Sequence, residues 1–462
     1  MPRRKRRHLA RIASLFLLML LQITIPSGET RMPITITHQD IITRPWLGLG
    51  IGWDAETKDI YPLPLTQQQW QTLFTRVDYM RPAWIRSMIN VAWFCPKGAV
   101  GTYAFNSPEM QAWYPILNYA KAHNIPVMIG TWDDVPWGFY SEDYATALTD
   151  LVQYLVKERG YTNIRYINAL NEPDSKLPDF ETWRAGARNI QTTLAKRGLS
   201  SQVSLVGPDT SWTNGWITQS DLPWNDSSFL GAYEWHHYER TCCNIQDGLV
   251  EQYFRSVIER LAGPEQLGSK PVLLGEMGWG YQSGPGDNQY RVKTYQYGVD
   301  MADFAMQVAR AGFSGAAAWD LDDAMHNKVW GMWNIVDEPE PRPWFYAWAL
   351  LSRYFPSGAT LYRPTSPDPR LRVVAAEIDR TGQSGIAVAM ANRGDAPANV
   401  ELTLPLASSH PLSGYVYSEE IPPRDLSLPG ARLLEQSGRE VNVQVPANGL
   451  LLITNLDHSS SG

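Results

Sequence analysis

The sequence of 462 residues contains few cysteines, and the three present are Cys95, Cys242 and Cys243. A disulfide framework would need more of them, so we expect an apolar core to hold the fold together. An odd count leaves one thiol over. The adjacent pair could form a vicinal disulfide, one of its members could bond to Cys95, or all three could stay reduced.

Motifs for metal and nucleotide binding are missing as well. His236 and His237 are neighbours at the end of one predicted strand, so their side chains point in opposite directions. Nothing near them has the His-x-x-x-His spacing of a zinc site. The run LGLGIGWD at 47–54 follows G-x-G-x-G and not the dinucleotide fingerprint G-x-G-x-x-G. We therefore expect no metal and no cofactor.

Charge is sparse, at 19% of residues with a net charge of -7, which argues against binding to nucleic acid or to anionic membranes. Aromatic residues are abundant, with 19 Trp and 22 Tyr. They indicate either a large aromatic core or a site that stacks on flat ligands such as sugar rings.

The N-terminal segment has a basic start at 3–7, a mostly apolar run at 12–25 and then Pro26-Ser27-Gly28. This order is typical of a secretory signal peptide, and the apolar run is short for a membrane span. We predict a signal peptide at 1–30 and a secreted or cell-surface protein, with an uncleaved signal-anchor as the alternative.

From about residue 45, short β-prone runs alternate with helical patterns; Trp70, Leu73, Phe74 and Val77, for example, recur at helical spacing. The predicted strands are 47–51, 84–89, 126–130, 164–169, 203–206, 232–235, 271–275 and 316–319. Strands that alternate with helices indicate a parallel sheet. Eight such units favour a closed (β/α)8 TIM barrel over an open doubly wound sheet.

The pattern changes after about Pro356, where short alternating runs such as LRVVAAEID and REVNVQV are separated by turn residues. We predict a barrel over 31–355 followed by a C-terminal antiparallel β-sandwich over 356–462. The run MPITITHQDI at 32–41 is a candidate for an extra strand of the sandwich. We expect this unit to be structural, because it lacks an obvious strip of aromatic side chains.

Candidate site residues gather where the active face of a (β/α)8 barrel is built, at the C-terminal strand ends. Taken in strand order they are Arg86, Trp132, Asn171, Glu172, Trp212, His236, Tyr238, Glu276, Trp279 and Trp319. Glu172 follows the fourth strand and Glu276 the seventh, so we expect both carboxyl groups in one cleft. Facing carboxylates suit cleavage of a glycosidic bond, and a separation near 5 Å would give retention.

The motifs Asn-Glu-Pro at 171–173 and Gly-Glu-Met-Gly-Trp at 275–279 resemble clan A of the glycoside hydrolases, which are retaining (β/α)8-barrel enzymes. The resemblance covers 45–355. With the sandwich, GPDTSW at 207–212 and EWHHY at 234–238, it is most similar to families 39, 30 and 5.

The resemblance implies a role for each candidate. Glu172 would be the general acid/base, with a raised pKa, and Glu276 the nucleophile. Arg86 and Tyr238 would hold Glu276. The remaining roles are a hydrogen bond to the sugar 2-hydroxyl for Asn171, the floor of the sugar subsite for Trp319, orientation of neighbours for His236, and further subsite walls for Trp132, Trp212 and Trp279.

These features together predict a secreted retaining enzyme that cleaves β-glycosidic bonds in polysaccharides or oligosaccharides. A non-catalytic carbohydrate-binding barrel and a metal-dependent barrel hydrolase are the alternatives. The expected partner is a carbohydrate substrate, with no nucleic acid and no membrane beyond the signal segment, and the oligomeric state stays open. Glu234 is assigned no role.

Overall fold

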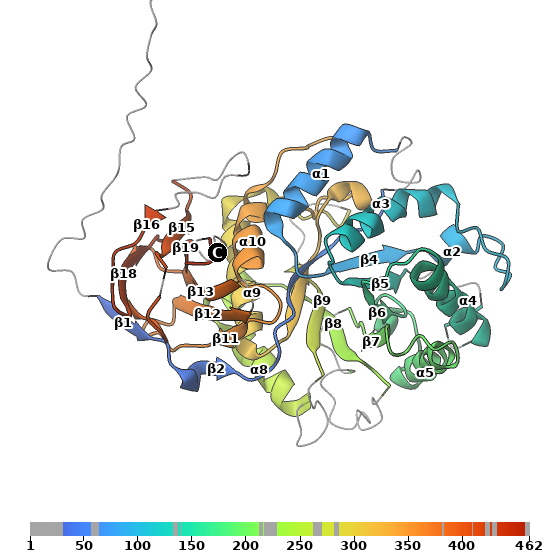
Figure 1. Ribbon diagram of the computed structural model, residues 1–462, viewed down its shortest axis with the longest axis horizontal. Coiled ribbons are helices and arrows are strands. Elements are labelled where there is room, and N and C mark those ends of the chain that lie inside the picture. Colours follow the sequence, from blue (N-terminus) through green and yellow to red (C-terminus); the bar gives the residue numbers. More distant parts are fainter. Residues whose placement is uncertain are drawn as a thin grey trace, which may run out of the picture.

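The structure is a computed structural model that describes residues 31–457 with several gaps. The segments outside the description in this range are 57–63, 133–136, 140, 212–215, 217–228, 262–269, 281–285, 381–382, 409, 421–425 and 427–431. The predicted signal peptide at 1–30 lies outside the described residues too. Figure 1 shows two units, a barrel ringed by helices and a smaller unit built of strands.

The barrel is closed and its strands are parallel, which confirms the predicted fold class. Its strands are β3 (Gly48–Gly52), β4 (Ile85–Ile89), β5 (Val127–Thr131), β6 (Ile164–Asn168), β7 (Ser204–Pro208), β8 (Ala232–Glu239), β9 (Val272–Trp279) and β10 (Gly315–Ala318). The ring closes where β10 pairs with β3, from Gly315 opposite Gly48 to Ala318 opposite Ile51.

Helices cover the outside of the barrel (Figure 1). They are α1 (Gln67–Met80), α2 (Val91–Phe94), α3 (Pro108–Ala122), α4 (Glu142–Gln153), α5 (Phe180–Lys196), α7 (Cys242–Gln246), α8 (Leu249–Leu261), α9 (Tyr295–Ala311) and α10 (Pro343–Tyr354). Shorter turns are η1 (His38–Asp40), η2 (Tyr154–Glu158), η3 (Pro173–Ser175), η5 (Tyr290–Lys293) and η6 (Asp323–Met325). Thr66, Ser141 and Asp179 cap α1, α4 and α5 by accepting a backbone N–H, which fixes where each helix begins.

The glycine-rich first strand makes room for a tryptophan in the barrel interior. Trp84 is buried there among Met128, Val206 and Leu273. A Cβ atom on Gly50 would lie 2.6 Å from the Trp84 ring, so a side chain does not fit at that position. The glycines of LGLGIGWD therefore serve close packing.

Two sheets form the sandwich, and the core between them is apolar. The first sheet contains β1 (Met32–Thr35), β14 (Ala398–Thr403), β18 (Glu440–Val445) and β17 (Gln436–Ser437). The second contains β16 (Arg432–Leu433), β15 (Ser413–Tyr417), β19 (Gly449–Thr454), β13 (Gln383–Asn392), β12 (Leu371–Arg380), β11 (Thr360–Tyr362) and β2 (Ile41–Ile42).

The chain enters the sandwich before it enters the barrel. β1 pairs with β14 and β2 pairs with β11, so these strands belong to the sandwich sheets although the sequence prediction placed 31–355 in the barrel. The cause is pairing between distant segments: β1 lies parallel to a strand more than 350 residues later, from Met32 opposite Val400 onward. The extra strand suggested by MPITITHQDI is thus present.

The sandwich packs on helix α9 through buried ion pairs. Arg393, which follows β13, donates from Nη2 to Asp300 Oδ1 at 2.5 Å, and Arg372 of β12 donates to Asp303. All four side chains are at most 5% exposed. We call Asp300, Asp303, Arg372 and Arg393 the interface cluster.

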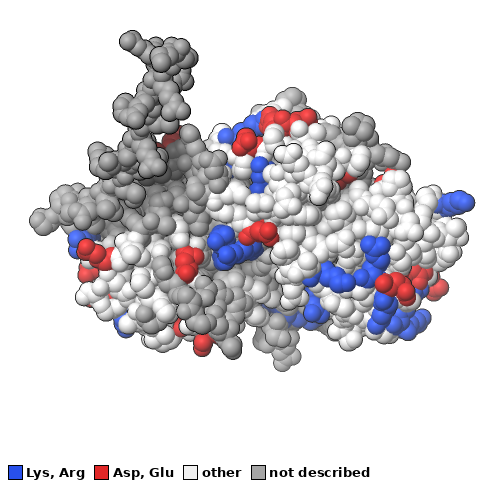
Figure 2. Space-filling model, turned by 45° about the horizontal axis from the view of Figure 1, so that its top comes forward, with Lys and Arg blue, Asp and Glu red and all other residues white. Residues whose placement is uncertain are grey.

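Charged side chains of both signs are mixed on the face shown in Figure 2, with wide uncharged areas between them. This distribution is consistent with the low charge of the sequence. No helix in the described part of the chain has both the length and the apolar character that crossing a bilayer requires.

Candidate active site

A cleft of about 600 Å³ opens at the C-terminal ends of the barrel strands. Its lining residues are Trp132, Asn171, Glu172, Ser211, Tyr238, Arg240, Glu276, Gly280, Asp287, Trp319, His326, Lys328 and Trp330. Six of the candidates chosen from the sequence are among them. Arg86 and His236 lie fully buried and bond to groups in this lining.

Glu172 stands in a sharp turn beyond the strand that leads to it. Strand β6 ends at Asn168, and Glu172 has a φ of 48°, a left-handed conformation that costs a non-glycine residue about 1–3 kcal/mol. Two backbone bonds hold the turn: the Glu172 N–H donates to Asp209 O at 3.1 Å, and the Asn171 N–H donates to Thr131 O at 2.8 Å. The neighbouring strand ends therefore fix the position from which the Glu172 side chain enters the cleft.

A β-bulge turns Glu276 toward the cleft. The pairing of β9 with β8 places Leu274 opposite Trp235 and Glu276 opposite His236, so Gly275 is the extra residue. Leu274 packs in the core outside the barrel. Strict alternation would have pointed Glu276 in the same direction as Leu274, and the extra residue reverses this.

Two donors hold the Glu276 carboxylate. Arg86 Nη1 donates to Oε1 at 2.6 Å, and the Tyr238 hydroxyl donates to Oε2. Burial, followed by the nearby charge of Glu276, raises the pKa of Tyr238 well above its usual value, so its hydroxyl keeps its proton as a donor. Both contacts were predicted for these residues, and their catalytic roles stay predictions.

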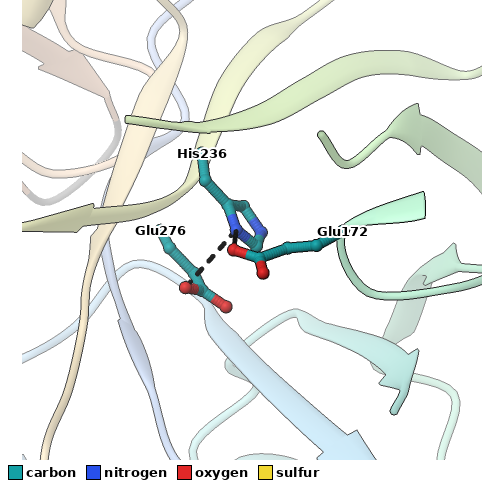
Figure 3. A group of neighbouring side chains, drawn as sticks. All are labelled: Glu172, His236 and Glu276. Carbon is teal, nitrogen blue, oxygen red and sulfur yellow. Dashed lines mark hydrogen bonds and ion pairs between the residues drawn. The ribbon is translucent and has the colours of Figure 1, made fainter. Parts of the chain in front are cut away.

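His236 lies between the two glutamates, as Figure 3 shows. Its Nδ1 is 3.1 Å from Glu172 Oε1 and 3.4 Å from Glu276 Oε2. Its Nε2 is 2.9 Å from Asp209 Oδ1. A carboxylate oxygen of Glu172 and one of Glu276 lie within 4.8 Å of each other, so the two groups meet across the barrel mouth.

The charge on His236 governs its neighbours. Burial lowers the pKa of this imidazole, but the charges of Glu276 and Asp209 outweigh burial and raise the pKa well above its usual value. The raised pKa favours the imidazolium form of His236, which can donate from both ring nitrogens.

The expected rise in the Glu172 pKa is wrong for this geometry. Burial does raise the pKa of Glu172, but the hydrogen bond from His236, the charge on that ring and the charge of Lys176 lower it, and the net pKa is lowered. Desolvation and nearby negative charge would raise the pKa of Glu172, but His236 is in direct contact with its carboxyl group and acts in the opposite direction.

Two buried acids beneath the cleft were missed by sequence reasoning. Asp209 accepts from Arg86 Nη2 at 3.2 Å and from His236, and Glu234 lies with its Oε1 3.9 Å from His236 Nε2. Glu234 is in phase with His236 and Tyr238 along β8, and that two-residue period was the signal that could have found it. We call Arg86, Glu172, Asp209, Glu234, His236 and Glu276 the mouth cluster.

Asn171 is placed as a sugar-binding residue would be. Its Oδ1 accepts from Arg86 Nη2 at 2.8 Å, and the residue lines the cleft beside Glu172. Because the carbonyl oxygen is engaged by Arg86, the amide NH₂ is the group able to donate to a ligand.

The four candidate tryptophans lie in different environments. Trp132 and Trp319 line the cleft with their rings nearly perpendicular, 6.0 Å between centroids at 80°. Trp279 is only 2% exposed, and the Arg291 guanidinium covers its ring at 3.8 Å, so it is not a subsite wall. Alternation after the bulge points Trp279 away from Glu276 and into the outer core. Trp212 lies outside the described residues.

His326 was not predicted for the site, although it lines the cleft. It bonds to Asp320 through Nε2 and stacks on Trp319, with 5.7 Å between ring centroids and 19° between planes. The charge of Asp320 outweighs burial and raises the pKa of His326. The acidic run DLDDAMH at 320–326 is, by its sequence, typical of a solvated loop with one ligand-facing member, but Asp320, Asp322 and Asp323 are buried.

Two sets of side chains in the mouth cluster have the chemistry of metal ligands. They are Glu172, His236 and Glu276, and Asp209, Glu234 and His236, each with ligand atoms within 4.8 Å of one another. The Arg86 guanidinium opposes a cation at either set, since its Nη2 is 3.1 Å from His236 Nε2.

Cys95 is buried, and the side chain of Cys242 lies outside the described residues, so the vicinal disulfide stays a hypothesis.

Comparison of the sequence with protein-family models and with curated proteins finds no match. Solved structures do share the fold. A GH30 endoxylanase from Clostridium papyrosolvens C71 has a TM-score of 0.65 at 14% identity, over 92% of this chain and 100% of that chain.

Two enzymes from Xanthomonas axonopodis pv. citri are similar as well. A GH51 arabinofuranosidase has a TM-score of 0.66 at 13% identity, over 92% of this chain and 100% of that chain. A GH39 enzyme has a TM-score of 0.62 at 12% identity, over 93% and 99%. The likeness is one of fold, and it includes barrel and sandwich together. The chain therefore has the fold of the clan A glycoside hydrolases, as the motifs around Glu172 and Glu276 predicted.

Proposed function

We propose that this chain is a retaining glycoside hydrolase that cleaves β-glycosidic bonds in polysaccharides or oligosaccharides. One observation carries the proposal: oxygens of Glu172 and Glu276 lie within 4.8 Å of each other beside a cleft that both residues line. Retaining enzymes separate their carboxyl groups by about 5–5.5 Å, whereas inverting enzymes need about 6.5–9.5 Å to admit a water molecule.

In the proposed reaction Glu276 attacks the anomeric carbon while Glu172 gives its proton to the leaving oxygen. A covalent glycosyl-enzyme forms, and Glu172 then takes a proton from the water that releases the sugar. Arg86 and Tyr238 suit Glu276 to this role, because their two bonds fix the direction of its oxygens. Asn171 would donate to the sugar 2-hydroxyl and Trp319 would support the ring.

Glu172 must hold a proton when the leaving group departs, yet its pKa is lowered through His236. A sugar ring between the carboxyl groups would exclude water from Glu172, and loss of water favours its neutral acid form. The reaction itself supplies a second change, because formation of the ester removes the negative charge of Glu276. Loss of water thus raises the pKa of Glu172 for the first step, in which it acts as an acid. Loss of the Glu276 charge lowers that pKa for the second step, in which Glu172 acts as a base.

The substrate class and the location are part of the same proposal. An endoxylanase and an arabinofuranosidase share the fold, so xylan and arabinofuranosides belong in the first substrate panel. The basic and apolar layout of 1–30 supports secretion or a place at the cell surface.

The test combines substitution with chemical rescue. Glu276→Ala and Glu172→Ala should each lower kcat/KM on an aryl glycoside by about 10³-fold or more, while azide should restore turnover and give a glycosyl azide. The matched control is Glu401→Ala, an exposed position on β14, which should behave as the wild type. Proton NMR of the first product should show retained configuration.

Inverted product would overturn the retaining mechanism. A wild-type protein that binds glycans but shows no turnover across the panel would instead identify the alternative, a non-catalytic carbohydrate-binding barrel.

A further inference from the structure

Beneath the proposed catalytic pair lie two acids to which the reaction assigns no step. Glu234 is 0% exposed and Asp209 is 1% exposed. Ligand oxygens of both lie within 4.8 Å of each other and of a His236 nitrogen. Two carboxylates this close and this deeply buried resist carrying two negative charges at once.

The available donors are distributed unequally between these acids. Asp209 accepts from Arg86 Nη2, at 3.2 and 3.3 Å, and from His236 Nε2 at 2.9 Å. Neither oxygen of Glu234 accepts an N–H from any residue in the described part of the chain. A buried anion without donors is costly, whereas a neutral carboxylic acid brings its own donor.

Electrostatics agree with the geometry. Burial, followed by the charge of Asp209, raises the pKa of Glu234 well above its usual value. Burial also acts on Asp209, but Arg86 and His236 outweigh it and lower the pKa of Asp209. The opposite directions of the two pKa shifts favour a proton on Glu234 and a negative charge on Asp209.

The backbone makes space for this carboxyl group. A Cβ atom on Gly275 would lie 1.5 Å from Glu234 Oε1, so a side chain cannot occupy that position while Glu234 holds its place. Gly275 is the extra residue of the bulge that turns Glu276 inward. The Glu234 carboxyl thus packs against the backbone immediately before the proposed nucleophile.

We propose that Glu234 is a positioning residue. Its carboxyl group stays neutral and donates a hydrogen bond to Asp209, so that the single negative charge of Asp209 faces Arg86 and His236. Those two cations in turn hold Glu276 and Glu172. The proton stays within the acid pair, and no bond to substrate is formed or broken by it. The effect on turnover rests on the proposed function, but the protonation state does not.

The charged and titratable groups that face this pair come from several elements. They are Arg86 on β4, Glu172 after β6, His236 on β8 and Glu276 on β9. The other three are in contact with His236, so a change in the protonation of Glu234 should be visible at that ring.

Infrared spectroscopy tests the protonation state without any substrate. At neutral pH the difference spectrum of wild type minus Glu234→Gln should show a carboxylic-acid C=O band, and the difference spectrum of wild type minus the control Glu401→Gln should show none. An unchanged carboxylic-acid band in Glu234→Gln would overturn the proposal. If Glu234→Gln does not fold, Glu234→Met supplies the same comparison.

Nitrogen NMR of the eight histidines tests the contact between Asp209 and His236. His236 should be an imidazolium at neutral pH in the wild type and in Glu234→Gln, because the amide of Gln can still donate to Asp209. In Asp209→Asn the ring should lose its proton at lower pH than in the wild type. A neutral His236 in the wild type would sink the proposal.

Kinetics separates positioning from a purely structural role. Glu234→Leu removes the donor and should lower kcat/KM by about 10²-fold through misplaced glutamates, whereas Glu234→Gln should retain more than about a tenth of the wild-type value. Equal losses in Gln and Leu variants of equal stability would contradict a donor role. Should the wild type show no activity, only the proposed function fails, because the infrared and NMR results stand alone.

Discussion

Two buried clusters of charged side chains in this molecule are built differently. In the interface cluster, between α9 and the sandwich, each arginine has an aspartate: Arg372 with Asp303 and Arg393 with Asp300. The mouth cluster of the barrel has two cations, Arg86 and His236, and twice as many carboxyl groups. Figure 1 shows α9 between the two units.

The two compositions suit different roles, one in holding two surfaces together and the other in acid–base chemistry. Paired charges can be buried at little net gain or cost, and they specify how two surfaces meet. An excess of acids over cations can be buried only if protons are held within the cluster, because each further anion would be uncompensated. Protons held beside a cleft are what acid–base chemistry requires, so the imbalance is consistent with the mouth cluster as the candidate site.

The largest expected effect comes from removing one arginine from each cluster. Arg86→Met leaves the charges of Asp209 and Glu276 without their cation, so it should cost about 3–5 kcal/mol of unfolding free energy and lower kcat/KM by about 10³-fold or more. Arg372→Met should cost a similar amount of stability yet leave kcat/KM of the folded fraction near the wild-type value. Denaturant unfolding and steady-state kinetics measure both.

A double variant provides the control. Arg372→Met with Asp303→Leu should recover much of the lost stability, since apolar residues can replace a buried ion pair at similar volume. If Arg372→Met lowered kcat/KM as strongly as Arg86→Met, the two clusters would not differ in the way described.

A smaller, pH-dependent effect is expected at Asp54, which lies near Arg86. Burial raises the pKa of Asp54 to about 7, above the value of about 3.9 for an unfolded chain. Because the folded state holds this proton more tightly, stability from Asp54 is present at acidic pH and is lost as pH rises toward 7. Asp54→Asn should therefore raise the melting temperature relative to wild type more at pH 8 than at pH 5.

The corresponding substitution in the interface cluster should lower stability instead of raising it. Asp303→Asn leaves Arg372 without a carboxylate and should destabilise the protein at both pH values. A melting difference for Asp54→Asn that is the same at pH 5 and pH 8 would contradict the raised pKa.

The smallest effect is expected for an exposed ion pair at the rim of the cleft. Lys328 Nζ and Asp287 Oδ2 are 2.9 Å apart, but the side chains are 46% and 52% exposed. Solvent weakens such pairs, so Asp287→Asn should change the unfolding free energy by less than about 0.5 kcal/mol. A loss above about 1 kcal/mol by denaturant unfolding would mean that burial is not what separates the strong pairs from the weak ones.

Particular residues show where sequence reasoning succeeded. The alternation of strands and helices predicted the barrel because each parallel strand needs a crossover, usually helical, to return the chain to the same end. Glu172 and Glu276 could be assigned to one rim because all parallel strands of a barrel end there. Neither inference needs contacts between distant residues.

Trp279, Glu234 and the pKa of Glu172 show where it failed. The bulge at Gly275 changed the phase of β9, which buried Trp279 and turned Glu276 inward. Glu234 was assigned no role although it has the same phase as His236, because the role of a buried acid cannot be inferred until its neighbours are known. β1 was suggested as a sandwich strand, but its partner β14 could not be identified because it lies far along the chain.

The sequence by itself determined the fold class and the rim on which the two glutamates lie, since periodicity and strand direction are local properties. Only the tertiary structure decided which side chains meet. It placed His236 between Glu172 and Glu276, set Asp209 against Arg86, and left Glu234 without a donor among the residues that the structure describes. Protonation depends on the distances between charges and on their burial, and these exist only once the strands have closed into a ring.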